Sequence, residues 1–305
     1  KKTQNATLYL NLEPCVHQGR TGPCVERILE AGVQEIFVSV EDPNPLVKGR
    51  GIRKLRRNGV RVQVGLCRDI ASCLNEKFFH FITTGTPFVL LKLALTLDGK
   101  ITSSEDSRWI TGTRARREAH RLRYEYDAIL VGVGTILQDD PALDVRWSRR
   151  NEITKVILDS RLRTPSRARI FHSGDPVIIF HSHKASRRNI QRLSSRATLL
   201  TVPQRKGLLD WLRVLTRLGK TQITSLLVEG GGEVATSLLQ DRQVQKVNFF
   251  YGSKVVGGSG HSLGDLGANG LEKSLRLRDL SLKRLSPDFG VEGYLEKGTG
   301  VSSIK

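Results

Sequence analysis

Short apolar runs alternate with amphipathic segments along most of the chain, and this alternation defines the expected elements. Residues 7–12 and 35–40 each form an apolar run of strand length, whereas residues 69–82 repeat apolar positions at helical spacing. Strands that alternate with helices at such intervals are typical of a parallel α/β sheet. Further strands are expected at 60–64, 88–95, 128–131, 155–158, 177–180, 197–202, 225–228 and 247–251, with two strand-like runs at 274–285 and 290–295.

The pattern is interrupted once by a cluster of turn-forming residues, Thr83-Thr84-Gly85-Thr86-Pro87. A chain of 305 residues is long enough for two domains that each have their own core. We therefore expect one domain over residues 1–85 and a second over residues 86–305.

The functional prediction for the second region is built around residues 224–239. A short apolar run there is followed by Glu229, three consecutive glycines and then apolar residues at helical spacing, which predicts a strand, a tight turn and a helix. Glycines let the backbone approach an anion, and the free N–H groups of a first helical turn favour negative charge. The stretch therefore predicts a phosphate cradle, and an ordinary strand-to-helix turn is the alternative.

Composition narrows the class of protein. A hydrophobic content of 38% and a charged content of 26% are typical of globular proteins, and no apolar run approaches the length of a membrane span. Without a basic segment and an apolar h-region at the start, we expect a cytoplasmic protein. The formal charge of +19 attracts anions, either nucleic acid or phosphorylated small molecules, and its spread over both halves does not choose between them.

Four cysteines are too few for a disulfide scaffold in a chain of this size. Cys15 ends an expected strand and Cys24 begins an expected helix, so their thiolates can share a zinc ion, which activates water for attack on an aminopyrimidine. A pair of buried cysteines without metal is the alternative. Zinc deaminases also use a His-x-Glu motif ahead of such cysteines, and none precedes Cys15.

A series of motifs resembles the bifunctional riboflavin-biosynthesis deaminase/reductase family. Each motif is weak alone, but together they run in order along essentially the whole chain, and the series is highly specific. In the first region they are Cys15 to Cys24 with Gly19-Arg20-Thr21, then Asp42-Pro43-Asn44-Pro45 and Gly49-Arg50-Gly51. In the second they are Lys92-Leu93-Ala94, Leu97-Asp98-Gly99, Trp109-Ile110-Thr111, Asp139-Asp140-Pro141-Ala142-Leu143, Leu158-Asp159-Ser160 and Val228-Glu229-Gly230-Gly231.

The resemblance implies a partial cytidine-deaminase-like domain followed by a dihydrofolate-reductase-like domain. It implies NADPH-dependent reduction of the ribosyl group of 5-amino-6-(5-phosphoribosylamino)uracil to the ribityl form. It also implies an incomplete Zn²⁺ site at Cys15 and Cys24, with deaminase activity only in the full-length protein. Because methionine is absent and the His-x-Glu motif is missing, we expect an N-terminally truncated chain.

By motif position, the resemblance also implies the site residues. The implied cofactor-lining residues are Ala94, Trp109, Thr135, Asp139, Ser160, Gly231, Gly232, Glu233, Val234, Ala235, Thr236 and Ser237. The implied substrate contacts are Ser107, Arg123, Leu143, Arg146 and Glu229. A guanidinium group suits a phosphate because it binds two oxygens at once. The structural alternatives are a solvated charged helix around Arg123, a turn cap at Asp139 and a core position for Trp109.

The leading interpretation is a reductase that takes a phosphorylated aminopyrimidine as its partner, with no nucleic acid and no membrane. The alternative is a basic nucleic-acid-binding module on a deaminase-like fold, suggested by the charge. Aromatic residues make up only 6% of the chain and do not interleave with the arginine run, which disfavours base stacking. A scaffold without turnover is a third interpretation, and a homo-oligomer is compatible with the sequence.

Overall fold

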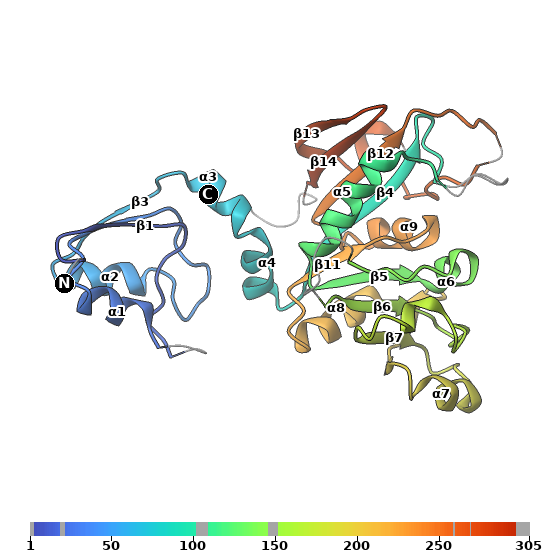
Figure 1. Ribbon diagram of the computed structural model, residues 1–305, viewed down its shortest axis with the longest axis horizontal. Coiled ribbons are helices and arrows are strands. Elements are labelled where there is room, and N and C mark those ends of the chain that lie inside the picture. Colours follow the sequence, from blue (N-terminus) through green and yellow to red (C-terminus); the bar gives the residue numbers. More distant parts are fainter. Residues whose placement is uncertain are drawn as a thin grey trace. The chain divides into compact units, whose positions relative to one another are not determined.

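The computed structural model describes residues 3–18, 22–101, 109–145, 152–258, 260–268 and 270–296. The chain divides into two compact units, Lys1–Thr86 and Pro87–Lys305, and each is described by itself (Figure 1). The division falls inside the turn-rich segment 83–87 that interrupts the hydropathy pattern. Within the described residues, no helix is long and apolar enough to cross a membrane.

The first unit is built on a parallel sheet of three strands in the order β1-β2-β3. Apolar residues of the sheet and of two helices form one small core, in which Val25 of α1, Ile36 of β2 and Leu55 of α2 are fully buried. The elements are β1 (Thr7–Leu10), α1 (Cys24–Glu30), β2 (Glu35–Val38), α2 (Arg50–Arg57), β3 (Arg61–Val64), α3 (Arg68–Leu74) and α4 (Glu76–Thr84).

The prediction of one continuous helix over residues 69–82 is wrong. The structure has two helices, α3 and α4, separated at Asn75, whose φ of −101° and ψ of 9° are not helical. The Asn75 amide donates to the carbonyl of Ala71 at 2.8 Å, and such a side chain competes with the backbone for hydrogen bonds. The apolar spacing continues across this break, so periodicity alone could not locate it.

A buried carboxylate organises the loop between β2 and α2. Glu13, which is 3% exposed, accepts backbone N–H bonds from Gly49 at 2.8 Å and Gly51 at 2.9 Å. It also accepts backbone bonds from Asp42 and Ile52, both at 3.2 Å. Since all four of these groups are backbone donors and the carboxylate oxygens accept from them, this residue attaches the loop to the end of β1.

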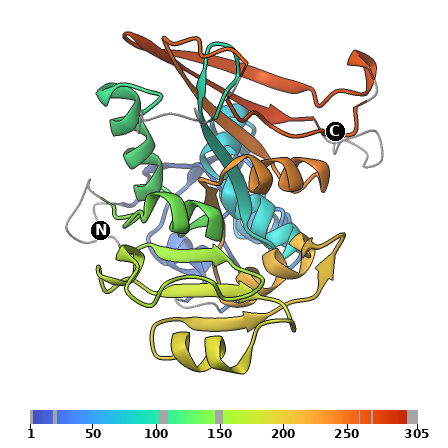
Figure 2. The same cartoon turned by 90° about the vertical axis from the view of Figure 1, so that its right-hand side faces the viewer.

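The second unit is a mixed sheet of nine strands in the order β13-β14-β12-β4-β11-β5-β6-β7-β8 (Figures 1 and 2). Strands β12 to β8 in this order are parallel, whereas β14 runs antiparallel to both β12 and β13. A separate hairpin, β9 (Gln204–Arg205) and β10 (Leu208–Leu209), was not predicted. The strands of the large sheet are β4 (Phe88–Thr96), β5 (Ala128–Gly132), β6 (Thr154–Leu158), β7 (Val177–His181), β8 (Thr198–Thr201), β11 (Ser225–Val228), β12 (Lys246–Gly252), β13 (Leu277–Leu285) and β14 (Asp288–Leu295).

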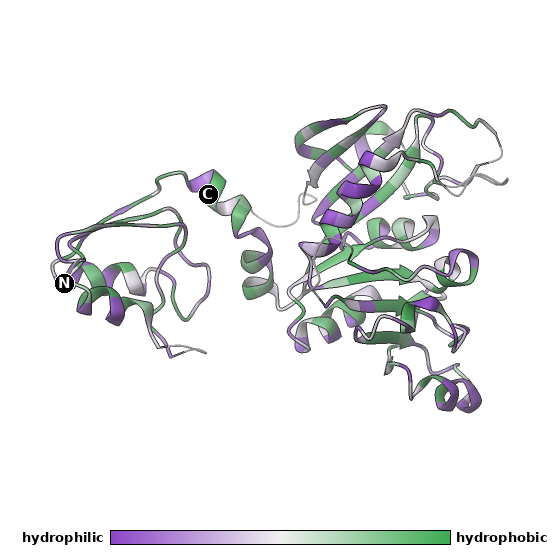
Figure 3. Ribbon diagram, in the orientation of Figure 1, coloured by the Kyte–Doolittle hydropathy of each residue, from purple (hydrophilic) through white to green (hydrophobic). Residues whose placement is uncertain are grey.

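Helices cover both faces of this sheet. Apolar residues of α8 (Trp211–Lys220) and α9 (Gly232–Gln240) share one core with Val89 and Leu91 of β4. Those of α5 (Thr113–Tyr124), α6 (Val133–Asp139) and α7 (Arg187–Leu193) share the other with Phe88 and Leu90. The central strands are mostly apolar, whereas α5 and α7 are largely hydrophilic (Figure 3), as expected for parallel strands that helices cover on both faces. The predicted α/β fold class is confirmed.

The connections reverse direction between two neighbouring strands, β5 and β11. After β5 the chain passes through α6 to β6, and after β11 it passes through α9 to β12 on the opposite side. The two helices lie against opposite faces of the sheet. Such a switch point leaves a crevice at the carboxyl ends of the strands, where α/β proteins bind ligands. The predicted glycine turn lies there.

Replacing Glu13 with Gln is expected to lower the unfolding free energy by about 2–4 kcal/mol, because the new amide donor would face backbone donors. Chemical denaturation monitored by circular dichroism measures the change. Glu41→Gln is the matched control, since Glu41 is an exposed carboxylate next to the same loop. Equal stability of the two variants would contradict this role for Glu13.

Candidate active site

The turn after β11 closes tightly on the end of β5. A methyl group at Gly230 would lie 2.7 Å from Cβ of Val234, and one at Gly132 would lie 2.7 Å from Cγ2 of the same valine. Both distances are too short for real atoms, so only glycines let the first turn of α9 approach this closely. At Gly231 the added atom would meet only Oγ1 of Thr135, at 4.0 Å. The space beside Gly231 is therefore open.

The start of α9 has the features of an anion site. Its N-cap is Gly231, and among the residues that the structure describes no side-chain capping hydrogen bond is made there. The N–H groups of that turn have no partner within a helix and carry partial positive charge. The backbone at Gly231, Gly232, Glu233 and Val234 therefore presents donors at the switch-point crevice.

The second half of the predicted cofactor turn faces elsewhere. Ala235 and Ser237 are buried in the core, where the Ser237 hydroxyl accepts from the indole of Trp211 at 3.1 Å. Thr236 accepts a backbone bond from Gly264 at 2.8 Å through its hydroxyl. Of residues 231–237, only the beginning of the helix is placed to hold a ligand with its backbone.

Four further predicted cofactor residues lie on β4, on α6 and just after β6. Ala94 is half-buried on β4, Thr135 lies in the first turn of α6, and Asp139 is exposed in its last turn. Ser160 follows β6, and its carbonyl accepts the Ser182 hydroxyl at 2.8 Å.

Trp109 is not part of the core. Its side chain is 52% exposed, and the Arg116 guanidinium lies 4.6 Å from the centre of the indole ring. This arrangement is a cation–π contact, and it leaves a flat apolar ring at the surface. A stacking role is therefore open to Trp109, whereas the core alternative does not hold.

Two of the predicted substrate residues form one ion pair. The Glu229 carboxylate, directly after β11, accepts from Arg123 Nε at 2.8 Å and from its Nη2 at 3.1 Å. Lys92 Nζ on β4 lies 3.4 Å from the same carboxylate. The three side chains are only 10–16% exposed, so a cluster of charges is held largely away from water. A bidentate pair of this kind fixes the relative orientation of the two side chains and also compensates their charges.

The cluster keeps Glu229 ionised despite its burial. Loss of solvent would raise the pKa of this carboxyl, but the charges of Arg123 and Lys92 outweigh that effect and lower it to about 2. Burial likewise opposes the charged form of Arg123, and the Glu229 carboxylate outweighs it, so the pKa of the guanidinium is raised. Both groups are therefore charged at neutral pH.

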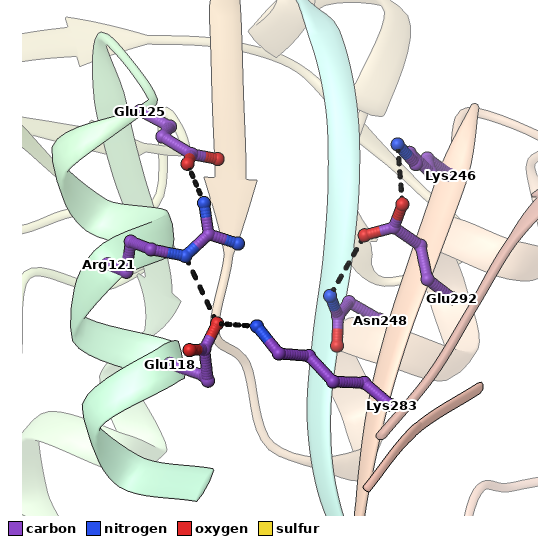
Figure 4. A network of polar contacts seen from close by, with 7 residues as sticks. All are labelled: Glu118, Arg121, Glu125, Lys246, Asn248, Lys283 and Glu292. Atoms are coloured by element: carbon purple, nitrogen blue, oxygen red, sulfur yellow. Dashed lines mark hydrogen bonds and ion pairs between the residues drawn. The ribbon is translucent and has the colours of Figure 1, made fainter. Parts of the chain in front are cut away.

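Arg123 does not belong to a solvated helix face. Its Nη1 also donates to the carbonyl of Asp144 at 3.2 Å, so three of its N–H groups are used within the protein. Arg121, on another side of the same helix, instead pairs with Glu118 and Glu125 in a separate network beside a cavity of about 210 Å³ (Figure 4). Spacing along the helix did not distinguish these two arginines.

Of the other three predicted substrate contacts, the structure describes only Leu143. Leu143 is 5% exposed and belongs to the core on the face of the sheet that α5, α6 and α7 cover. Ser107 and Arg146 lie outside the described residues, as does the Gly19-Arg20-Thr21 motif of the first unit.

Sequence reasoning named Lys92 only as part of a motif and missed it as a member of the charge cluster. The available signal was a single lysine in the middle of the apolar strand Phe88–Thr96, where a charge is costly unless it is paired. Asp144 carried no such signal, because it contributes its carbonyl to Arg123 from an irregular segment.

The predicted zinc ligands are neighbours in the first unit. The backbone N–H of Cys24 donates to Sγ of Cys15 at 3.4 Å. Burial and then the nearby Cys15 sulfur raise the pKa of the Cys24 thiol. Across the described residues, no three His, Cys, Asp or Glu side chains are grouped to hold a metal ion. Two thiols are fewer than the three or four protein ligands of a zinc site, so Cys15 and Cys24 alone do not complete one.

The switch-point crevice and the uncapped helix start are typical of α/β proteins that bind a phosphate-bearing ligand at a helix N-terminus. Comparison with known proteins makes this class specific. Residues 87–291 match the RibD C-terminal domain family. The riboflavin biosynthesis protein RibD of Aquifex aeolicus is 38% identical over 291 residues, which cover 95% of this chain and 80% of that protein.

Solved structures agree with this match. RibD of Acinetobacter baumannii, in its form 1, has a TM-score of 0.84 and 30% identity, covering 97% of this chain and 82% of that one. The Thermotoga maritima diaminohydroxyphosphoribosylaminopyrimidine deaminase/5-amino-6-(5-phosphoribosylamino)uracil reductase has a TM-score of 0.79 and 31% identity, covering 96% and 80%. The chain belongs to the RibD family, and the family resemblance of its motifs is confirmed.

The Glu229 cluster predicts a pH dependence of stability. The folded pKa of about 2 is below the ordinary value of 4.5, so the ion pair contributes fully above pH 4.5 and is lost as the pH falls toward 2. This shift corresponds to about 3 kcal/mol. The difference in unfolding free energy between wild type and Glu229→Gln should therefore narrow across this interval in denaturant titrations.

The control is Glu233→Gln, which removes an exposed carboxylate on the neighbouring helix. Its difference from wild type should stay small at every pH. A Glu229→Gln difference that does not change between neutral pH and pH 2 would show that the ion pair does not hold the carboxylate ionised.

Proposed function

We propose that this chain is an NADPH-dependent reductase of riboflavin biosynthesis, which reduces the ribosyl group of 5-amino-6-(5-phosphoribosylamino)uracil to the ribityl form. Membership of the RibD family supports the proposal, and the name of the Thermotoga maritima relative includes this reductase activity. The observation that carries it is the buried cluster of Glu229, Arg123 and Lys92 beside the open glycine turn. On this proposal, residues 86–305 form a reductase domain of the dihydrofolate-reductase type.

The residues at the switch point fit the cofactor. The open space at Gly231 admits a phosphate group, and the uncapped N–H groups of α9 suit the charge of a pyrophosphate. Thr135 faces the same space, and Trp109 offers a flat apolar ring. Ala94, Asp139 and Ser160 remain proposed cofactor contacts. When bound there, NADPH supplies the hydride.

The charge cluster suits the substrate. An ionised Glu229 accepts hydrogen bonds from ribose hydroxyls or pyrimidine N–H groups. Arg123 has five N–H donors, of which three are used within the protein, so two remain for a phosphate oxygen or a carbonyl. Holding the sugar carbon against the nicotinamide and excluding water are the main contributions that the protein can make to hydride transfer. Ser107, Leu143 and Arg146 remain proposed substrate contacts.

For the first unit we propose the C-terminal part of a zinc-dependent deaminase domain, over residues 1–85. The neighbouring thiols of Cys15 and Cys24 support a zinc site to which they supply two ligands. Deaminase activity is expected only in the full-length protein. A cytoplasmic location and a homo-oligomeric state remain predictions from the sequence.

The nucleic-acid-binding alternative is not favoured. The formal charge of +19 suggested it, yet two arginines of the basic helix α5, Arg121 and Arg123, pair with carboxylates of the protein. Arginines that contact phosphates of nucleic acid would need to be available at the surface.

The direct test is an absorbance assay of NADPH oxidation with the phosphorylated aminopyrimidine, on a preparation whose zinc content is measured. We expect turnover that depends on the 5′-phosphate and leaves the ribityl product. The same pyrimidine without its phosphate is the control substrate. No oxidation of NADPH by folded protein at any substrate concentration would overturn the proposed function.

Replacing Gly231 with Val fills the proposed cradle. The position has φ of −69° and free space, so the variant should fold with an unchanged melting temperature. The dissociation constant for NADPH, measured by fluorescence titration, should rise about 100-fold or more because the valine side chain would keep the pyrophosphate away from the backbone N–H groups. Wild-type affinity in the folded variant would show that this turn is not the cradle.

A further inference from the structure

A second buried ionic group lies next to the charge cluster, centred on Lys155 of β6. This lysine is fully buried, and its ammonium lies 3.0 Å from Oδ1 of Asp144, 3.0 Å from Oδ2 of Asp175 and 2.6 Å from the hydroxyl of Ser173. An ammonium group has three hydrogens and here has three acceptors. A buried charge persists only when it is compensated in this way, so the position of Lys155 is strongly determined.

The segment that Lys155 holds is conformationally unusual. Leu143, just before Asp144, has φ of +57°, in the left-handed region that a leucine rarely adopts. A residue in this region costs on the order of 1–3 kcal/mol and persists only where its surroundings hold it. The Leu143 side chain packs in the core, and the Asp144 carboxylate binds Lys155. These two contacts hold the turn in this shape.

Asp144 connects Lys155 to the proposed substrate site. Its side chain binds Lys155, while its backbone carbonyl accepts from Arg123 Nη1 at 3.2 Å. Arg123 in turn binds Glu229, which also contacts Lys92. Charges therefore alternate along the series Lys155, Asp144, Arg123, Glu229 and Lys92. The side chain of Asp144 is 39% exposed, whereas that of Lys155 is not exposed at all. Lys155 is therefore the more firmly held end of this series of charges.

We propose that Lys155 is a positioning residue for the reductase reaction. By fixing Asp144 it sets the direction of the Arg123 guanidinium, and thereby the place of the Glu229 carboxylate that faces the phosphorylated aminopyrimidine. Lys155 does not touch the substrate or the cofactor. This inference rests on the proposed function, and it adds a residue that neither the motifs nor the family resemblance assigns to the site.

The test is the variant Lys155→Met, which keeps the length of the side chain and removes its charge. Because Arg123 then loses a fixed partner, KM for the phosphorylated aminopyrimidine should rise about 10-fold to 100-fold. The dissociation constant for NADPH should stay within about twofold of wild type, since the glycine turn is not part of this series. If Lys155 only stabilised the fold, the variant would be less stable, but KM for the substrate would not rise while the dissociation constant for NADPH stays the same.

Lys246→Met is the matched control. Lys246 of β12 is 14% exposed and lies 2.8 Å from Glu292 in the separate network of Figure 4, so it too is a largely buried lysine paired with a carboxylate. Its replacement should leave KM for the substrate unchanged. If both lysine variants raise this KM equally, or if Lys155→Met leaves it unchanged, the positioning role is overturned.

A double-mutant cycle tests whether Lys155 acts through Asp144. Asp144→Asn removes the charge that binds Lys155 and keeps the carbonyl that binds Arg123. If the two residues act in one series, the double variant should raise KM no more than Lys155→Met alone, whereas independent effects would multiply. Multiplying effects would contradict the proposed route.

Hydrogen exchange separates this inference from the proposed function. In protein without ligands, Lys155→Met should speed exchange of the backbone amides around Leu143 and Asp144 relative to Lys246→Met. Absence of turnover by the wild type would overturn the proposed function, whereas unchanged exchange in Lys155→Met would overturn the anchoring of the segment, whatever the substrate is.

Discussion

Charges that are removed from water must be paired, and this constraint determines how the elements of the second unit meet at the candidate active site. Glu229 leaves the end of β11 and finds Arg123 on α5 and Lys92 on β4. Removing one partner of such a group would leave an uncompensated buried charge, which is strongly destabilising. The helix and the two strands are therefore held in one arrangement, and the carboxylate stays ionised where a polar substrate would bind.

A second constraint, close packing of the backbone, places the glycine turn at the start of α9 beside these charges. Gly132 and Gly230 both face Val234 with no room for a Cβ atom, so the first turn of α9 lies directly on the ends of β5 and β11. At Gly231 the opposite condition holds, because the space is open. On the proposed function, close packing at two glycines and open space at the third leave room for a phosphate-bearing ligand next to an acidic group, as a dinucleotide-dependent reductase requires.

The candidate site could be predicted only in part. The strand, turn and helix over residues 224–239 follow from local spacing, because a buried strand, a glycine run and an amphipathic helix each have a local signature. The direction of the side chains within that helix could not be predicted from the spacing. Ala235 and Ser237 were expected to line the cofactor, but both face the core. The break at Asn75 was also missed, because apolar spacing carries no information on a backbone that leaves the helix for one residue.

The sequence by itself determined the α/β class, the strands of the two main sheets and the family to which the chain belongs, because these depend on spacing and on residue types in a fixed order. Only the tertiary structure decided which charges meet. Arg121 and Arg123 are residues of the same type on one helix, two positions apart. Arg121 nevertheless pairs with Glu118 in a peripheral network, whereas Arg123 pairs with the buried carboxylate of Glu229. Lys155 and Asp144 likewise meet only in the folded chain. Pairing between distant residues depends on the packing of elements, which has no local signature.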